Sequence, residues 1–395
     1  MTSANVLVIN CGSSSLKFAV LEPKTGSVAC HGLAERLGTR AARLLLAGAA
    51  EIALGEGAGP AEVLARAEPL LASRTLVAVG HRVVHGGEAF ADSVLLDAAA
   101  LDRIRAASRL APLHNPANLL GIEVARMRFP DLSQVAVFDT AFHQSLPAKA
   151  YLYAVPYELY AEQQVRRYGF HGTSHRYVAG EAARRIGKPL SELQLITAHL
   201  GNGCSTCAIK AGQSLDTSMG LTPLEGLVMG TRSGDVDPNL HLFIAERTGQ
   251  SLSEITDLLN RKGGLLGLSG LSNDMRSLLA AAEHNPRARL AVDVFCYRLA
   301  KSILGLCAAL ERLDALVFTG GIGEHAAAVR AQVLGELAFL GAKLDASANR
   351  EHGQFTSGRI SAAGSRLLAL VVPTNEELVI AREAARCASA ARKEA

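Results

Sequence analysis

The sequence lacks several features that would assign it to common classes of protein. It holds no GxxxxGK[ST] motif, which excludes the P-loop proteins. No apolar stretch reaches the length of a bilayer span, and no basic segment precedes the first apolar run, so we expect neither a membrane helix nor a secretory signal. The net charge is only +3 and no basic stripe with interleaved aromatic residues is present, so nucleic acid is a poor candidate for a partner.

Disulfides are also not expected. The seven cysteines are scattered and odd in number, which favours reduced thiols and a cytoplasmic location. Cys204 and Cys207 form a lone CxxC pair. In a strand their side chains would point to opposite faces, so we interpret them as structural thiols rather than as a zinc or redox pair.

Length and composition predict a globular protein of two domains. The chain has 395 residues, of which 49% are hydrophobic and 19% charged. Residues 41–72 are rich in Ala, Leu and Gly and are expected to form surface helices and loops. Five of the seven tyrosines lie between Tyr151 and Tyr168, and we place the crossing between domains at the start of this cluster. A clustered aromatic core is the alternative interpretation, and the two are compatible.

The chain contains a polar turn between two short apolar runs, and it contains this pattern twice. Asn10–Lys17 lies between residues 6–9 and 18–21, and His199–Ser205 lies between residues 193–198 and 206–209. Each copy predicts a hairpin whose N–H groups and hydroxyls suit a phosphate. Alone, the first copy is equally an ordinary polar turn. The second copy favours a duplicated α/β domain with a phosphate-binding turn in each half.

A third glycine-rich turn, residues 319–324, follows the strand-like residues 315–318. Three such turns predict a nucleotide site in a cleft between domains. Apolar residues at spacings of three and four over 292–310 predict a long helix, with Pro286 in its first turn.

The last predicted helix follows residues 374–377. Thr374 and Glu377 have the spacing of a capping box, which gives Glu377 a structural role. Glu376 is then left to face a cleft.

Ten blocks in chain order resemble one family, the acetate kinases. They are NCGSSSLK (10–17), GHRVVHGGE (80–88), LAPLHNP (110–116), VFDTAFH (137–143), RRYGFHGTSH (166–175), HLGNGCS (199–205), DTSMGLTPLEG (216–226), GTRSGDVDP (230–238), FTGGIGE (318–324) and TNEEL (374–378). The resemblance is weakest over about residues 33–72. It implies two duplicated actin-like ATPase (ribonuclease H-like) α/β domains with a nucleotide cleft between them, each built on a mixed five-stranded sheet.

The implied domains are residues 1–150 and the nucleotide-binding residues 151–374, with a C-terminal helix of about residues 375–395 packing on the first. The implied reaction is reversible, direct in-line transfer of the ATP γ-phosphoryl group to acetate, giving acetyl phosphate and ADP. It would use Mg²⁺, or Mn²⁺ in its place, in a cytoplasmic homodimer.

Other readings remain open. A propionate or other short-chain fatty acid kinase is the alternative within the class. The resemblance places the acetate kinases in a superfamily with the sugar kinases, actin and the heat-shock chaperone ATPases. A nucleotide-gated switch or chaperone-like ATPase of that superfamily would have no use for Arg82, His171 and Arg232 together. A sugar kinase would need polar groups where the acetate kinase pattern has apolar ones.

Acetate is already ionised at neutral pH, so catalysis needs positioning and charge neutralisation rather than a base. By resemblance, Arg82 holds the acetate carboxylate, and Arg232 and His171 stabilise the transferring phosphoryl group. Asp139 matches an acidic active-site residue of the family. We favour orienting Arg82 or Arg232, or holding Mg²⁺ through water, as its role. His114 is a weaker candidate for the ligand site, and a structural histidine is the alternative.

The resemblance also implies binding residues. Asn10 and Glu376 match the positions assigned to Mg²⁺. Nucleotide contacts are implied for Lys17, His199, Leu200, Gly201, Asn202, Gly203, Asp274, Met275, Arg276, Gly320, Gly321, Ile322, Gly323 and Glu324. The acetate methyl group is expected among Val84, Leu113, Phe170 and Pro223, and the β-branched Val84 favours acetate modestly. His325 stands where the family more often has Asn, a departure that concerns the adenosine contact rather than the chemistry.

Overall fold

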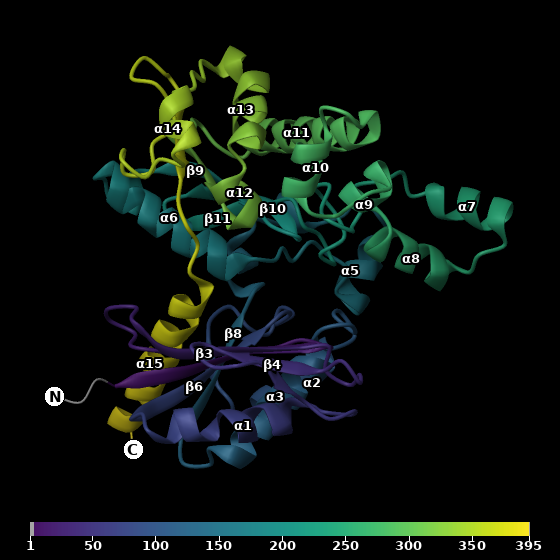
Figure 1. Ribbon diagram of the computed structural model, residues 1–395. Coiled ribbons are helices and arrows are strands. Elements are labelled where there is room, and N and C mark those ends of the chain that lie inside the picture. Colours follow the sequence, from purple (N-terminus) through teal and green to yellow (C-terminus); the bar gives the residue numbers. More distant parts are fainter. Residues whose placement is uncertain (1–3, 395) are drawn as a thin grey trace. The chain divides into compact units, whose positions relative to one another are not determined.

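The computed structural model describes residues 4–394 and divides into two compact units (Figure 1). Unit 1 comprises the described residues up to Gln144 together with those from Asn375 onward, and unit 2 comprises Ser145–Thr374. Unit 2 therefore begins before the expected crossing at Tyr151. Within the described range, no helix is long and apolar enough to cross a membrane.

Unit 1 is built on a mixed sheet with the strand order β5-β4-β3-β2-β1-β6-β8-β7. Its strands are β1 (Asn5–Cys11), β2 (Ser15–Leu21), β3 (Val28–Glu35), β4 (Arg43–Leu46), β5 (Ile52–Ala53), β6 (Leu76–Val83), β7 (Val94–Leu95) and β8 (Ser133–Phe138). The predicted hairpin is present as β1 and β2, in which Asn10 pairs with Lys17. Strands β6 and β8 run parallel to β1 and carry the sheet away from the hairpin.

Two expectations for this unit are wrong. The sheet has eight strands among the described residues, not five. Residues 41–72 do not form only surface helices and loops, because they supply β4 and β5 to the sheet and the helix α1 (Pro60–Ala72). Leu44 and Leu64 of this segment are fully buried, and their burial is what draws the segment onto the core.

Helices cover both faces of this sheet, following the two-residue alternation of β1. Leu7 and Ile9 pack in one core with Val63 of α1 and Val124 of α3 (Asn115–Arg128). The opposite face carries Val6 and Val8, which pack against α15 (Glu376–Glu394). The helix α2 (Ala98–Ala107) packs against α3.

The helix α15 lies along β6, β8 and β1 (Figure 1). Its close approach depends on Gly80, because a Cβ there would lie 2.7 Å from Cγ2 of Ile380. The predicted capping box at its start is wrong. Asn375 caps the helix instead, accepting a hydrogen bond from the N–H of Leu378 at 3.0 Å. Thr374 turns away to the hydroxyl of Ser174, and Glu377 forms an ion pair with Lys17.

Unit 2 has its own mixed sheet, with the order β11-β10-β9-β12-β13. Its strands are β9 (Gln194–Leu200), β10 (Cys204–Lys210), β11 (Gln213–Thr217), β12 (Ala315–Thr319) and β13 (Leu368–Val371). The second predicted hairpin is the antiparallel pair β9 and β10, and β12 lies parallel to β9. Unit 2 thus repeats the order of unit 1: an antiparallel hairpin whose first strand has a parallel neighbour.

Unit 2 also contains helices of very different lengths. They are α4 (Ala148–Tyr151), α5 (Tyr157–Gln163), α6 (Gly172–Ile186), α7 (Leu240–Thr248), α8 (Leu252–Arg261), α9 (Gly264–Ser269), α10 (Met275–Ala281), α11 (Pro286–Cys307), α12 (Gly320–His325), α13 (Ala327–Glu336) and α14 (Ala346–Arg350). The long predicted helix is α11, which has Pro286 in its first turn and ends before Leu310. The third prediction, a glycine-rich turn over residues 319–324, is wrong. The chain passes directly from β12 into the helix α12, which begins at Gly320.

Candidate active site

In unit 1, Arg82 and Asp139 come from neighbouring parallel strands. Arg82 lies near the end of β6, and Asp139 follows directly after β8. The Arg82 guanidinium donates from Nε to Oδ1 at 3.0 Å and from Nη2 to Oδ2 at 2.6 Å. Asp139 is 1% exposed. Its negative charge raises the pKa of Arg82, while burial raises the pKa of Asp139 and the guanidinium opposes that rise.

A second carboxylate lies near this pair. Glu376, the first residue of α15, acts electrostatically on both Arg82 and Asp139. Its Oε1 atom is buried and has no hydrogen-bond partner in the described part of the chain. A buried carboxylate oxygen without a donor is costly unless a cation or a water meets it.

These residues fit Mg²⁺ by their chemistry. The predicted metal residues are Glu376 and Asn10. Asn10 is the last residue but one of β1. Both offer the hard oxygen atoms that Mg²⁺ prefers, and the orphaned Oε1 atom supplies an open ligand. Over residues 4–394, no three His, Cys, Asp or Glu side chains are grouped as a metal cage.

The remaining predicted residues of unit 1 differ in their surroundings. Lys17 lies 2.7 Å from Glu377 Oε1, and its side chain is 52% exposed. Val84 is buried and its N–H donates to Oδ1 of Asn118 at 3.0 Å. Leu113 is 56% exposed, which is unlike a residue already enclosed in an apolar pocket.

In unit 2, His171 occupies an unusual backbone conformation. It precedes α6 with a φ of 56°, in the left-handed region that a non-glycine residue rarely adopts. Its Nδ1 atom lies 2.9 Å from Oγ of Ser205, which also lies 2.8 Å from Nε2 of His175. When Ser205 donates to Nδ1, neutral His171 carries its proton on Nε2 and can donate it to a phosphoryl oxygen.

Arg232 converges with His171 on the turn between β9 and β10. A Cβ added to Gly203 would lie 2.9 Å from Nη2 of Arg232 and 3.3 Å from Nε2 of His171. Burial lowers the pKa of Arg232. Nη1 of Arg232 donates to the carbonyl of Pro223 at 2.6 Å, and the guanidinium forms no ion pair with any residue among 4–394. A desolvated cation without a counter-charge is suited to an anionic ligand.

The predicted nucleotide segments of unit 2 also meet. The Asn202 carbonyl accepts from the N–H of Gly230, and its side-chain oxygen accepts from Asn273, the residue before Asp274. Gly320 has a φ of 75°, and a Cβ there would meet the backbone of Leu200 at 2.8 Å, so only glycine fits.

The side chains of these nucleotide segments are less uniform. Glu324 accepts hydrogen bonds from the N–H groups of Gly320 and Thr374, so it orders the start of α12. His199 Nδ1 lies 2.8 Å from Oγ of Ser174, and Asp274 precedes α10. Arg276 is 89% exposed, so it extends into solvent.

Comparison with known proteins identifies the family. The model of the acetokinase family matches residues 5–382. An acetate kinase of Deinococcus radiodurans is 57% identical over 386 residues, covering 96% of this chain and 97% of that protein. The chain belongs to the acetokinase family.

Solved structures of the acetokinase family share this fold. A propionate kinase from Francisella tularensis superimposes with a TM-score of 0.92 at 44% identity, covering 97% of this chain and 99% of the other. An acetate kinase from Porphyromonas gingivalis gives 0.90 at 40% identity, with the same coverages. The fold is therefore the α/β, actin-like ATPase fold expected of acetokinases, and the two sheets are its repeated halves.

Several supporting residues of this acetokinase were not predicted. Asn118 joins Val84 to the first hairpin, because its Nδ2 donates to the Cys11 carbonyl at 2.7 Å. Ser205 orients His171. Both lie near quoted motifs, but no spacing in the sequence indicates these long-range contacts. The same holds for Arg167, which lies in the block RRYGFHGTSH and whose partners are described below.

Cys204 and Cys207 are free and buried. Burial raises the pKa of each thiol to about 12, so both stay protonated and inert near neutral pH. Their interpretation as structural thiols agrees with this environment.

Proposed function

We propose that this protein is an acetate kinase that transfers the γ-phosphoryl group of ATP to acetate, reversibly and in line. The observation that carries the proposal is the near-full-length similarity to acetate kinases, together with the family match over residues 5–382. The unpaired, desolvated Arg232 supports it, because phosphoryl transfer between two anions requires such a cation.

Arg82 is proposed to hold the acetate carboxylate. Asp139 takes its Nε–H and one Nη2–H. A guanidinium has five N–H donors. The edge formed by Nη1 and Nη2 therefore still offers two parallel hydrogen bonds to a second carboxylate. Asp139 thereby fixes the plane of the guanidinium, and acetate binds at its open end.

No proton needs to move in the forward reaction. A carboxylate oxygen of acetate forms a bond to the γ-phosphorus, and the bond from that phosphorus to the β,γ-bridging oxygen breaks. The electron pair of the broken bond leaves with ADP. Asp139 is therefore assigned to orienting Arg82, and no base is required.

His171 and Arg232 are proposed to stabilise the transferring phosphoryl group, since their nitrogen atoms converge on Gly203. The backbone N–H groups of the turn Gly201–Gly203 would approach the ATP phosphates, as would Lys17. Residues 274–276 and 320–324 would frame the adenosine.

Glu376 and Asn10 would hold Mg²⁺. When bound, the ion neutralises phosphate charge and orients the leaving oxygens. Glu376 supplies the buried, unpartnered oxygen for it. Mn²⁺ has similar preferences and can take its place.

We further propose a cytoplasmic homodimer, and a division into domains at residues 1–150 and 151–374. The acetate methyl group would contact the apolar residues Val84, Leu113, Phe170 and Pro223. We expect the β-branched Val84 to narrow this pocket and so to favour acetate modestly over longer acids.

Trapping of acyl phosphate with hydroxylamine tests the function. The purified protein with ATP and Mg²⁺ should form acetyl phosphate, with a higher kcat/KM for acetate than for propionate or butyrate. A preference for propionate would favour the alternative that the Francisella tularensis relative represents. Failure to form acyl phosphate from any short acid would overturn the kinase assignment.

A further inference from the structure

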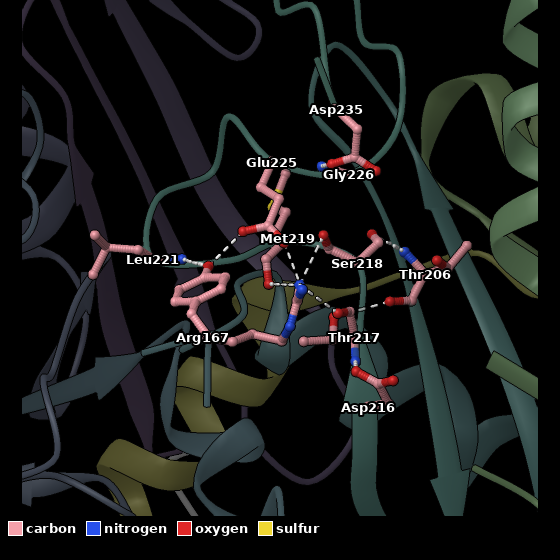
Figure 2. A network of polar contacts seen from close by, with 11 residues as sticks. Arg167, Thr206, Asp216, Thr217, Ser218, Met219, Leu221, Glu225, Gly226 and Asp235 are labelled. Atoms are coloured by element: carbon pink, nitrogen blue, oxygen red, sulfur yellow. Dashed lines mark hydrogen bonds and ion pairs between the residues drawn. The ribbon is translucent and has the colours of Figure 1, made fainter. Parts of the chain in front are cut away.

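Arg167 joins three backbone carbonyls and one carboxylate in unit 2 (Figure 2). Its Nη1 atom donates to the carbonyls of Thr217, Ser218 and Met219 at 2.9, 3.1 and 3.1 Å. Its Nη2 atom donates to Oε1 of Glu225 at 2.5 Å. One side chain thus gathers both ends of the segment 217–225 around itself.

Tyr153 completes this arrangement from a third segment of the chain. Its hydroxyl donates to Oε2 of Glu225 and accepts the N–H of Leu221 at 2.8 Å. Burial and the negative charge of Glu225 raise the pKa of Tyr153, so the hydroxyl remains a donor at any physiological pH. We call Tyr153, Arg167 and Glu225 the Arg167 clamp.

The loop inside the clamp is built without spare room. Gly220 lies against the Glu225 carboxylate and the Tyr153 hydroxyl, and a Cβ at this position would overlap both. Gly226 has a φ of 105°, and a Cβ there would collide with the Ser218 carbonyl. The clamp therefore holds one tightly specified loop conformation.

This loop contacts Arg232 and the segment that leads into His171. The carbonyl of Pro223, inside the clamped loop, accepts the 2.6 Å hydrogen bond from Nη1 of Arg232. The carbonyl of Gly220 accepts from the N–H groups of Tyr168 and Gly169, close in sequence to His171. A shift of the loop would move the Pro223 carbonyl that holds Arg232, and it would move Tyr168 and Gly169, which precede His171.

We propose that the Arg167 clamp positions Arg232 and His171 for phosphoryl transfer, and that Tyr153, Arg167 and Glu225 are positioning residues of the reaction. The proposal rests on the proposed function. It differs from a purely structural role, because loss of the clamp would lower kcat by displacing Arg232 and His171 rather than by lowering the amount of folded protein. Small displacements of catalytic groups lower the reaction rate strongly, so a hydrogen bond remote from the reacting atoms can affect kcat.

The test is a double-mutant cycle between Tyr153→Phe and Arg232→Ala, measured as kcat for acetyl phosphate formation. Tyr153→Phe removes one hydroxyl and keeps the ring. We expect it to lower kcat about tenfold in the wild-type background, the effect of losing a hydrogen bond to a charged group, with the KM for ATP changed less than kcat. In the Arg232→Ala background it should cause a smaller loss, because only the route through the segment that precedes His171 remains.

A matched control shows whether any arginine network in unit 2 has this effect. Arg312 donates to the Asp314 carboxylate at 2.8 Å and to the Glu192 carbonyl at 2.6 Å, much as Arg167 does to its partners. Arg312→Lys should leave kcat unchanged. Arg167→Lys should lower it, because a single ammonium nitrogen cannot take the places of both Nη1 at the three carbonyls and Nη2 at Glu225. Melting temperatures of all variants give the folding contribution.

The outcomes separate the two proposals. An inactive wild-type enzyme contradicts the proposed function. An active wild-type enzyme in which Tyr153→Phe lowers kcat equally in both backgrounds contradicts the clamp. A crystal structure of Tyr153→Phe gives a readout that needs no activity: the Arg232 contact with the Pro223 carbonyl should lengthen, and an unchanged contact would overturn the inference.

Discussion

Arg82 and Asp139 form a two-point ion pair across neighbouring parallel strands, with contacts of 3.0 and 2.6 Å. Because β6 and β8 are in register at their ends, the two side chains leave the sheet at the same edge. Asp139 is almost fully buried, so the pair is desolvated and its geometry is well defined. The edge of the guanidinium that Asp139 does not occupy is therefore held in one orientation.

The first prediction concerns Asp139→Asn. The amide retains the volume of the side chain but loses the charge that orients Arg82, so kcat/KM for acetate should fall about 10²-fold. Breaking a buried pair should also lower the free energy of unfolding by about 3–5 kcal/mol. Steady-state kinetics and urea unfolding measure the two effects. If Asp139 were a base, the wild-type enzyme would show an acidic limb in its pH–rate profile that Asp139→Asn lacks; we expect no such difference.

The second prediction concerns Arg232→Ala. Arg232 has no carboxylate partner among the described residues, so its charge is available to the phosphoryl group as charge develops there. Its removal should lower kcat about 10³-fold or more while the KM for ATP changes little. Arg312→Ala, which removes an arginine that is 55% exposed, is the control. A rise in the KM for ATP with unchanged kcat would instead make Arg232 a residue of ground-state binding.

The third prediction uses two adjacent glutamates at the start of α15. Glu376 carries the unpartnered buried oxygen, while Glu377 pairs with Lys17 at 2.7 Å. Glu376→Gln should raise the Mg²⁺ concentration for half-maximal activity about 10- to 100-fold, because it replaces a charged oxygen ligand. Glu377→Gln should leave that concentration unchanged. Equal Mg²⁺ dependence in the two variants would contradict the metal assignment, and isothermal titration with Mg²⁺ and ADP gives a check independent of turnover.

The sequence predicted the features that depend on local patterns. The β1–β2 hairpin with Asn10 beside Lys17, the β9–β10 hairpin and α11 follow from short apolar runs, turn residues and helical spacing. The acetokinase motifs indicated which residues belong to the site. Neither source could predict contacts between segments far apart in the chain, such as the hydrogen bond between Ser205 and His171.

Predictions failed where tertiary contacts compete with local preference. Thr374 has the right spacing for a capping box, but its hydroxyl bonds to Ser174, so Asn375 caps α15 instead. The alanine-rich region 41–72 has little strand pattern, yet Leu44 enters the core and brings β4 into the sheet. In both cases a partner distant in sequence decides the structure.

The last prediction concerns His81, which is buried in β6 and lies 2.8 Å from Oε1 of Gln134. Burial lowers the pKa of His81 from 6.5 to about 4, so between these values the unfolded chain binds a proton that the folded chain does not. The free energy of unfolding should fall as pH falls through this window, by about 1.4 kcal/mol per pH unit from this residue. Urea unfolding at several pH values should show a slope in His81→Gln that is smaller by one proton. Gln134→Met is the control, because it removes the hydrogen bond at every pH but keeps the imidazole: it should lower stability and retain the slope. Identical slopes in His81→Gln and the wild-type protein would show that His81 is already charged when folded.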